Sequence, residues 1–321
     1  MKKHLTAILL IGLISNVALA QKFVPFKYGD MNQWVTRVIP ESFIIGGETK
    51  KVYEIGPTQT IEGAKSYSNL GGSPWETSNI YARVVGINKT SNAVFPDVRN
   101  GSDMCVKMQT IIETCKAIGL INIDVLVGGS IFLGQIFEPI TSTKAPYSKM
   151  EMGIPFTERP KALRYDYKVF VPEVDERYYI SGFSKKKTYE GRDSAEVYIF
   201  LQQRWEDADG NIYANRVGTG RERYFQSTDG WVNAHDMEIH YGDITSKPFF
   251  KHYMGLRPVE HCYYARNSKG KVVPVKEIGW AAEDAKPTHM LVMASSASGD
   301  AYLGTPGITL WLDNIGLVYE D

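Results

Sequence analysis

The sequence predicts an all-β protein built as an antiparallel β-sandwich, and two observations carry that prediction. Apolar and polar residues alternate with period 2 in several segments, most clearly at 161–171, 194–205 and 308–319, which is the pattern of half-buried strands. Turn residues such as Gly, Asn, Asp and Pro separate the segments at intervals of about ten residues, and no segment has a strong helical pattern. Many short strands of this kind are typical of a sandwich.

The first third of the chain is expected to form short strands joined by loops. An extended lead-in precedes a first strand around Trp34, and further strands are expected at 40–47, 51–55 and 80–87. Trp75 lies among small polar residues and is expected in a loop. The segment 88–101 is also expected to be loop, because it ends in the turn signal Asn-Gly.

Residues 104–123 fit two kinds of structure. Met108, Ile112 and Cys115 have the spacing of one helical face, whereas Val106, Thr110 and the isoleucines that follow favour a strand because they are β-branched. We predict strand. Glycines interrupt the apolar run at 125–134 and indicate bends or bulges there.

The second half of the chain carries the clearest strands. Besides 161–171 and 194–205, strands are expected at 236–241 and 289–294. The segment 207–211 has two Asp residues and an Asn but lacks the Glu of a calcium loop, so a hairpin turn is preferred.

The final strand contains a charge inside its alternating pattern. Ile308, Leu310 and Leu312 alternate with polar residues and are followed by Asp313. A buried carboxylate needs a partner or a metal ion. Asp313 is therefore expected to be bound by another group of the protein or by a cation.

The N-terminus has the features of a secretory signal peptide at 1–20. A basic start is followed by the apolar run 5–17 and by Ala18-Leu19-Ala20, a small-x-small cleavage site. The run is too short to span a membrane, and no later stretch approaches about twenty apolar residues. We therefore expect an exported protein, in the periplasm, at the cell surface or outside the cell, with residues 21–321 forming one domain.

The charge balance excludes two classes of partner. Cleavage after residue 20 would remove Lys2 and Lys3 and leave 34 basic and 36 acidic residues. A nucleic acid or an anionic membrane needs a basic surface, so neither is expected as the partner.

The three cysteines are Cys105, Cys115 and Cys262. The first two could pair across a hairpin and leave the third free. A domain of this size has enough core to fold without a disulfide, and we prefer free thiols.

Three stretches in order resemble a known family. They are Gly29-Asp-Met-Asn-Gln-Trp34, the segment 152–163, and the end of the chain from Ser295 to Tyr319. Together they are similar to the putative carbohydrate-metabolism domain family of Bacteroidetes secreted proteins, and the end also resembles the closing strand of carbohydrate-binding jelly-roll modules. The resemblance implies a jelly-roll sandwich with a pocket for sugar, and it leaves 248–286 as an insertion.

A structural calcium ion is one implication of that resemblance. In sugar-binding jelly rolls, an early acidic residue and an Asp of the last strand share the ion, and the matching positions are Asn32 and Asp313. Asn32 offers only a neutral oxygen where calcium prefers carboxylates. The alternative, given equal weight, is that Asp313 accepts backbone N–H bonds at a strand bend. No cofactor is otherwise required.

The candidate glycan-binding residues are an aromatic and polar set. Aromatic rings stack on sugar faces while planar polar groups bind hydroxyls. The set includes Arg159, which matches an Arg-Pro step of the family and has a guanidinium fork suited to vicinal hydroxyls or a carboxylate. The candidates are Trp75, Arg159, Glu196, Tyr198, Gln202 and Arg221. Core packing is the alternative for each aromatic residue, and an internal ion pair is the alternative for Arg159.

Catalysis is not indicated by the sequence. Glycosidases need two carboxyl groups at defined separations, and the Glu-x-Asp-x-x-Glu pattern of retaining jelly-roll glycosidases is absent. The predicted function is therefore an exported protein that binds an oligo- or polysaccharide in a concave jelly-roll pocket. A glycoside hydrolase with carboxylates on separate strands is the first alternative, and a structural or adhesive surface protein is the second.

Overall fold

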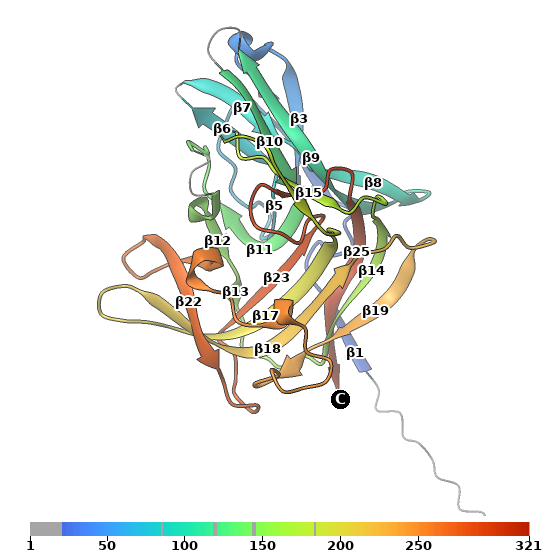
Figure 1. The fold of residues 1–321 in the computed structure, drawn as a ribbon, viewed down its shortest axis with the longest axis vertical. Coiled ribbons are helices and arrows are strands. Elements are labelled where there is room, and N and C mark those ends of the chain that lie inside the picture. The colour runs from blue at the N-terminus through green and yellow to red at the C-terminus, as the bar shows by residue number, and fades with distance from the viewer. Residues whose placement is uncertain (1–20, 85, 118–120, 143–145, 183, 321) are drawn as a thin grey trace, which may run out of the picture.

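Two large β-sheets face each other in the computed structural model, which describes residues 21–320 except 85, 118–120, 143–145 and 183 (Figure 1). The first sheet has the order β10-β9-β25-β14-β19, with β1 paired to β25 and β8 paired to β9, all antiparallel. Its strands are β1 (Gln21–Pro25), β8 (Val94–Asn100), β9 (Asp103–Ala117), β10 (Ile121–Gly128), β14 (Ala162–Phe170), β19 (Val232–Glu238) and β25 (Thr309–Glu320).

The second sheet has the order β12-β11-β23-β17-β18-β22-β21. Short strands β5, β13 and β20 pair with β11, β23 and β18, and β18 pairs with β22 in parallel. The bounds are β5 (Trp75–Thr77), β11 (Ser130–Ile136), β12 (Met150–Met152), β13 (Ile154–Pro155), β17 (Ala195–Glu206), β18 (Ile212–Tyr224), β20 (His240–Tyr241), β21 (Tyr263–Arg266), β22 (Val272–Trp280) and β23 (His289–Ser295).

Smaller sheets extend the two large ones. The three-stranded sheet β3-β2-β4 and the β6–β7 hairpin lie beside the ends of β9 and β10, and together they form an arm at the top of Figure 1. The smaller strands are β2 (Trp34–Pro40), β3 (Thr49–Ile55), β4 (Gln59–Glu62), β6 (Ile80–Val84), β7 (Ile87–Ser91), β15 (Glu176–Tyr179), β16 (Lys187–Glu190) and β24 (Leu303–Gly304). The helical segments are 3-10 turns: η1 (Phe43–Ile45), η2 (Pro146–Lys149), η3 (His252–Met254) and η4 (Val259–His261). Within the described part of the chain, no helix has the length and hydrophobicity needed to cross a membrane.

The main core lies between the two large sheets. Because side chains alternate between the faces of a strand, Leu310 and Leu312 of β25 face inward, as do Val197 and Ile199 of β17, and all four are at most 1% exposed. The intervening side chains of β17 point to the outer face of the second sheet. That outer face carries the cleft described below. The predicted fold class, an all-β sandwich, is confirmed.

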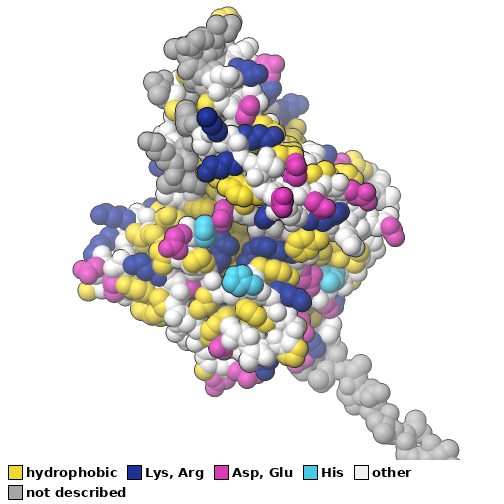
Figure 2. Space-filling view, viewed as in Figure 1, with side chains coloured by type: hydrophobic (Ala, Val, Ile, Leu, Met, Phe, Trp, Pro, Cys, Tyr) yellow, Lys and Arg dark blue, Asp and Glu magenta, His cyan; other side chains and the backbone are white. Residues whose placement is uncertain are grey.

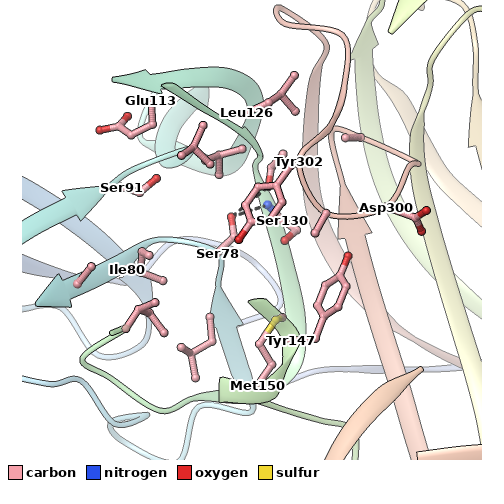
Figure 3. A pocket seen from close by; sticks show the side chains of 18 of the residues that line it. Ser78, Ile80, Ser91, Glu113, Leu126, Ser130, Tyr147, Met150, Asp300 and Tyr302 are labelled. Atoms are coloured by element: carbon pink, nitrogen blue, oxygen red, sulfur yellow. Dashed lines mark hydrogen bonds between the residues drawn. The ribbon is translucent and has the colours of Figure 1, made fainter. Parts of the chain in front are cut away.

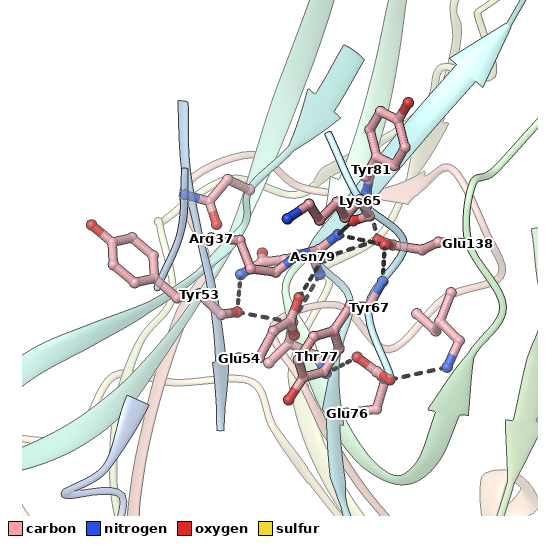
Figure 4. A network of polar contacts seen from close by, with 12 residues as sticks. Arg37, Tyr53, Glu54, Lys65, Tyr67, Glu76, Thr77, Asn79, Tyr81 and Glu138 are labelled. Carbon is pink, nitrogen blue, oxygen red and sulfur yellow. Dashed lines mark hydrogen bonds and ion pairs between the residues drawn. The ribbon is translucent and has the colours of Figure 1, made fainter. Parts of the chain in front are cut away.

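A buried polar network fastens the small sheet β3-β2-β4 to the second large sheet (Figure 4). Arg37 of β2 donates hydrogen bonds to Glu54 of β3 at 2.9 Å and to Glu138, directly after β11, at 2.5 Å. Glu76 of β5 accepts a bond from the backbone N–H of Ile136 at 3.1 Å. Burial raises the pKa of Glu54 to about 7 and that of Glu76 well above its usual range. Arg37 therefore pairs with two of the three buried carboxyl groups, and the pKa shifts favour protons on Glu54 and Glu76.

The strongest alternating segments are strands, as predicted. The segments 51–55, 161–171, 194–205, 289–294 and 308–319 correspond to β3, β14, β17, β23 and β25. In the ambiguous segment 104–123, residues 104–117 lie in β9 and 121–123 begin β10, so the strand prediction is confirmed there, while 118–120 lie outside the described residues. The segment 207–211 is the predicted hairpin turn, closed by a hydrogen bond from the N–H of Gly210 to the carbonyl of Asp207.

Three local predictions for the first third are wrong. The expected strand at 40–47 holds the 3-10 turn η1, in which Phe43 is 92% exposed, so its apolar residues do not mark a buried strand. The expected loop 88–101 contains most of β7 and all of β8. The strand expected at 80–87 is confirmed over 80–84 as β6, and residue 87 already belongs to its hairpin partner β7. Trp75 begins strand β5 instead of lying in a loop. The proposed signal peptide, 1–20, is outside the described residues.

The cysteines are free, as preferred from the sequence. Cys105 and Cys115 both lie in β9, where ten residues of extended chain separate them by about 33 Å. A disulfide needs Cα atoms less than about 7 Å apart, so the hairpin pairing is wrong. The segment 248–286, expected to be an insertion, supplies β21 and β22 to one edge of the second sheet.

Candidate functional site

A cleft of about 660 Å³ separates the arm from the second large sheet. Its walls come from hairpins β6–β7 and β9–β10, and its floor comes from β17, β21 and β23. Figure 2 shows this face hollowed between the arm and the sandwich, with hydrophobic and basic side chains in the hollow. In Figure 3, Ile80, Ser91 and Glu113 lie on one side of the cleft, and Tyr147 and Asp300 lie on the other.

The floor is formed by outward-pointing side chains of the second sheet. Tyr198 of β17 stacks on Phe200 at 4.7 Å between ring centroids, and its hydroxyl lies 2.8 Å from the sulfur of Met293. Tyr263 of β21 contacts both rings at 6.1 Å. These aromatic rings form a rigid floor because each is held by its neighbours.

Glu196 is fixed at one edge of the floor by two arginines across the β17–β18 pair. Its Oε2 atom accepts hydrogen bonds from Arg221 Nη2 at 2.7 Å and from Arg223 Nε at 3.0 Å. Arg221 also donates to the carbonyl of Tyr253 at 2.6 Å. The pair Glu196–Arg221 is almost fully buried, so its charges are compensated within the protein.

Two buried hydroxyl groups of the cleft have no hydrogen-bond partner in the described part of the protein. They are Ser91 Oγ on β7 and the Tyr263 hydroxyl on the floor. Buried polar groups in proteins are nearly always hydrogen-bonded, to protein, water or ligand. Both oxygen atoms are enclosed by their neighbours, and each has an unused capacity for hydrogen bonds next to the cleft.

Arg257 faces the same floor, and only the Nε atom of its guanidinium group has a hydrogen bond to a described residue. Its Nε atom donates to the carbonyl of His261 at 2.9 Å, and its guanidinium lies 5.3 Å over the ring of Tyr263. Burial acts to lower the pKa of Arg257. The neighbouring tyrosines and Glu196 act in the opposite direction and together raise this pKa above its usual value. Among the described residues, no acceptor is bonded to its two terminal nitrogens, so the fork is free to bind a ligand.

Every carboxylate that lines the cleft in the described residues lies beside a basic side chain. Glu196 binds Arg221 and Arg223, Glu113 binds Lys89 at 2.9 Å, and Asp300 lies 3.0 Å from His261. Burial raises the pKa of Tyr147 on the opposite wall to about 12, so this hydroxyl is neutral near pH 7. The cleft thus offers aromatic rings, hydroxyls and a guanidinium, while Glu196 and Glu113 are engaged in ion pairs with arginine and lysine side chains.

The sequence profile of a family described as "Putative carbohydrate metabolism domain" matches residues 48–318, most of the chain. The chain belongs to this family. The resemblance inferred from its sequence is therefore confirmed. Among curated proteins, no significant match was found.

Three solved structures are similar to this member of the family. A "putative glycoside hydrolase" from Bacteroides thetaiotaomicron is 14% identical, with a TM-score of 0.43 over 95% of each chain. Another from Bacteroides vulgatus is 13% identical, with a TM-score of 0.43 over 93% of this chain and 94% of that one. A carbohydrate-binding module that recognises mannan is 9% identical, with a TM-score of 0.21 over 77% and 90% of the two chains.

Three of the six predicted glycan-binding residues meet at the floor of the cleft. Glu196 and Tyr198 line it, and Arg221 lies behind Glu196 as its ion-pair partner. Gln202, on the same face of β17, is fully buried and donates to Glu277 at 2.5 Å. Its side chain therefore has a structural partner away from the cleft.

Trp75 and Arg159 lie elsewhere. Trp75 is 1% exposed in the main core, where its ring contacts Phe26 edge-on at 5.5 Å and its indole N–H donates to the carbonyl of Lys27. A ring so enclosed has no free face for a sugar. Arg159 donates to the carbonyls of Ala285 and Glu283, and its guanidinium lies 3.9 Å over the ring of Tyr241. These contacts hold the backbone around 283–285.

The two proposed calcium ligands are occupied by protein groups. Asp313 is fully buried and binds Arg99, whereas Asn32 accepts a bond from the N–H of Met104 and donates to Asp103. A guanidinium thus supplies the positive charge that a calcium ion would bring. In the parts of the chain that the structure describes, no group of three or more His, Cys, Asp or Glu residues could hold a metal ion. The residues present therefore do not fit the calcium site.

The sequence did not single out several residues of the cleft. Arg257 and Tyr263 lie in the segment treated as an insertion, and Ser91 lies in the segment predicted as loop. No short motif marks them, because the register of β21 and the turn η4 bring them to the floor. The one available signal was composition: this segment contains several Tyr and Arg residues at short spacing.

Proposed function

We propose that this protein binds a glycan in the cleft and takes part in carbohydrate metabolism as a binding protein. Membership of the carbohydrate-metabolism family supports the ligand class. The observation that carries the proposal is the group of unpartnered polar atoms in the cleft: the Tyr263 hydroxyl and the terminal nitrogens of Arg257 at the aromatic floor, and Ser91 Oγ on the β7 wall.

The chemistry of a sugar fits these groups. A pyranose has apolar faces that pack on aromatic rings and a rim of hydroxyls that donate and accept hydrogen bonds. Tyr263 and Ser91 can each donate and accept, and the guanidinium fork of Arg257 can bind two neighbouring oxygens at once. A bound sugar would therefore satisfy groups that the folded protein leaves without partners.

The ion pairs of the cleft favour binding over hydrolysis. A glycosidase needs one carboxyl group to donate a proton and a second to act as base or nucleophile. Glu196, Glu113 and Asp300 each face a basic side chain. We accordingly assign Glu196 to holding the floor in place, while hydrolysis stays as the alternative that the experiment below distinguishes.

We also propose that the protein acts after export. The basic start, apolar run and small-x-small site within residues 1–20 support a signal peptide. Free thiols agree with a domain whose core is large enough to need no disulfide. Export would place the binding protein in the periplasm, at the cell surface or outside the cell, where polysaccharides are degraded.

A glycan-array screen of residues 21–321 tests the proposal, with mass spectrometry of the array glycans after incubation. We expect binding without cleavage, weakened in Arg257→Met and unchanged in Arg192→Met, whose charge is partly exposed and outside the cleft. Circular dichroism checks that both variants are folded. Released sugar would support the hydrolase instead, and no binding to any glycan would refute both.

A further inference from the structure

The cleft has a polar half and an aliphatic half. Its polar half is the floor around Tyr263 and Arg257. Its other half lies between hairpins β6–β7 and β9–β10, which face each other across the cleft with aliphatic side chains. These side chains are Ile80, Val84, Ile87, Ile123, Val125 and Val127.

This aliphatic wall is not part of the protein core. On β10, Ile123, Val125 and Val127 alternate to the same face of the strand and are half-buried. Val84 of β6 is 38% exposed. Except for Ile80, none of the six packs into any hydrophobic cluster of the described residues. The wall is therefore apolar surface that the described residues leave partly exposed to the cleft.

The wall is continuous with the floor. Ile80 packs against the same cluster of aromatic and aliphatic side chains as Met293, and that cluster includes Tyr198 and Tyr263 of the floor. A single ligand can thus contact both halves. The charged residue pair at the wall is Lys89 with Glu113, at 2.9 Å, and Lys89 also binds Glu41 at 3.1 Å. Because Lys89 lies between two carboxylates, the described residues of the wall offer no unpaired positive charge to an anionic ligand.

A sugar alone does not match this arrangement. Hydroxyls placed against aliphatic side chains lose their hydrogen bonds to water without replacement, which is unfavourable. We propose that the ligand is an amphipathic glycoside, with its sugar on the floor and an uncharged alkyl chain along the aliphatic wall. This inference rests on the proposed function, since it gives the glycan of the cleft an apolar aglycone.

A series of alkyl maltosides tests the inference by calorimetric titration below the micelle concentration. Maltose and the hexyl, octyl and decyl maltosides share one sugar and differ in chain length. If the chain lies on the wall, the affinity rises about threefold to fourfold for each added methylene, the equivalent of about 0.8 kcal/mol per buried CH₂. Equal affinity for all three alkyl maltosides would overturn the inference.

Variants of the wall show where the chain binds. In the double variant Val125→Thr/Val127→Thr, and separately in Val84→Thr on the facing hairpin, we expect the gain per methylene to fall by at least half. Val98→Thr is the matched control, because Val98 is 61% exposed and outside the cleft. A chain-length gain that stays the same in both wall variants would also overturn the inference.

A sugar-free amphiphile separates this inference from the proposed function. Octyl sulfobetaine carries the same chain as octyl maltoside without a sugar, and we expect it to bind at least tenfold more weakly. If it binds as tightly and loses affinity in the wall variants, the aliphatic wall is a binding surface but the glycan proposal fails. If free oligosaccharides bind and chain length has no effect, the glycan proposal stands and the amphipathic ligand is refuted.

Discussion

The guanidinium of Arg99 lies 2.5 Å from the buried carboxylate of Asp313, from Nη1 to Oδ2. The same nitrogen lies 2.6 Å from Asp166 on the neighbouring strand β14. One arginine from β8 therefore joins two carboxylates across the first sheet. The buried carboxylate of Asp313 in the last strand therefore has a side chain, Arg99, as its partner.

Replacing this arginine tests that assignment. Arg99→Met should lower the free energy of unfolding by about 3 kcal/mol, since it leaves a buried carboxylate without its partner. Urea unfolding measures the change. Arg192→Met, whose ion pair is long and largely exposed, should change it by less than about 0.5 kcal/mol. The wild-type melting temperature should not respond to a chelator, and a clear fall with chelator would show that a metal ion stabilises the protein.

The buried carboxyl groups around Arg37 predict how stability depends on pH. Burial raises the pKa of Glu54 to about 7 and raises that of Glu76 well above its usual range. The folded state thus holds protons that the unfolded state releases near pH 4 to 5, so stability falls as the pH rises from about 4.5 to 7 and above. Urea unfolding at pH 5 and pH 8 should give the larger free energy at pH 5.

A substitution within the network sharpens this test. Glu76→Gln removes a titrating group and should make the decrease between pH 5 and pH 8 smaller. Glu48→Gln, on an exposed carboxylate, is the control and should leave the decrease unchanged. A stability that rises from pH 5 to pH 8 would mean that these carboxyl groups are ionised in the folded protein.

Trp75 predicts a loss of stability without a direct effect on binding. Its side chain is buried in the main core, so Trp75→Ala should cost about 3–5 kcal/mol in urea unfolding. Trp205→Ala is the exposed control, at 42% exposure, and should cost about 1 kcal/mol or less. If the folded Trp75 variant instead kept wild-type stability and lost glycan affinity, the ring would be a ligand contact.

Local alternation was sufficient to predict the long strands but not what surrounds them. Strands such as β17 and β25 repeat apolar residues with period 2 over their length, because one face lies in the core. The 3-10 turn at Phe43 is equally apolar and yet exposed, since nothing packs over it. A pattern within one segment does not contain that information.

The site depended even more on contacts between distant segments. Glu196 and Tyr198 could be inferred, because alternation places them together on one face of one strand. Arg257 and Tyr263 reach the same floor only through the pairing of β21 with β22, about sixty residues later in the chain than β17. Similarly, the sequence marked Asp313 as needing a partner, but only the pairing of β8 with β9 brings Arg99 to it.

The hydroxyl of Tyr263 provides the most direct test of glycan binding in the cleft. It is buried and has no partner among the described residues, so Tyr263→Phe should leave the free energy of unfolding within about 0.5 kcal/mol of wild type. The same variant should bind the array-identified glycan about fivefold more weakly, because it lacks one hydrogen bond worth about 1 kcal/mol. Tyr165→Phe is the matched control: its hydroxyl is bonded to Tyr224 at 2.5 Å in the sandwich, so it should lose stability and keep its affinity. Calorimetric titration measures the glycan affinity of wild type and both variants, and urea unfolding measures their stability. Wild-type glycan affinity in a folded Tyr263→Phe variant would contradict the cleft as the glycan site.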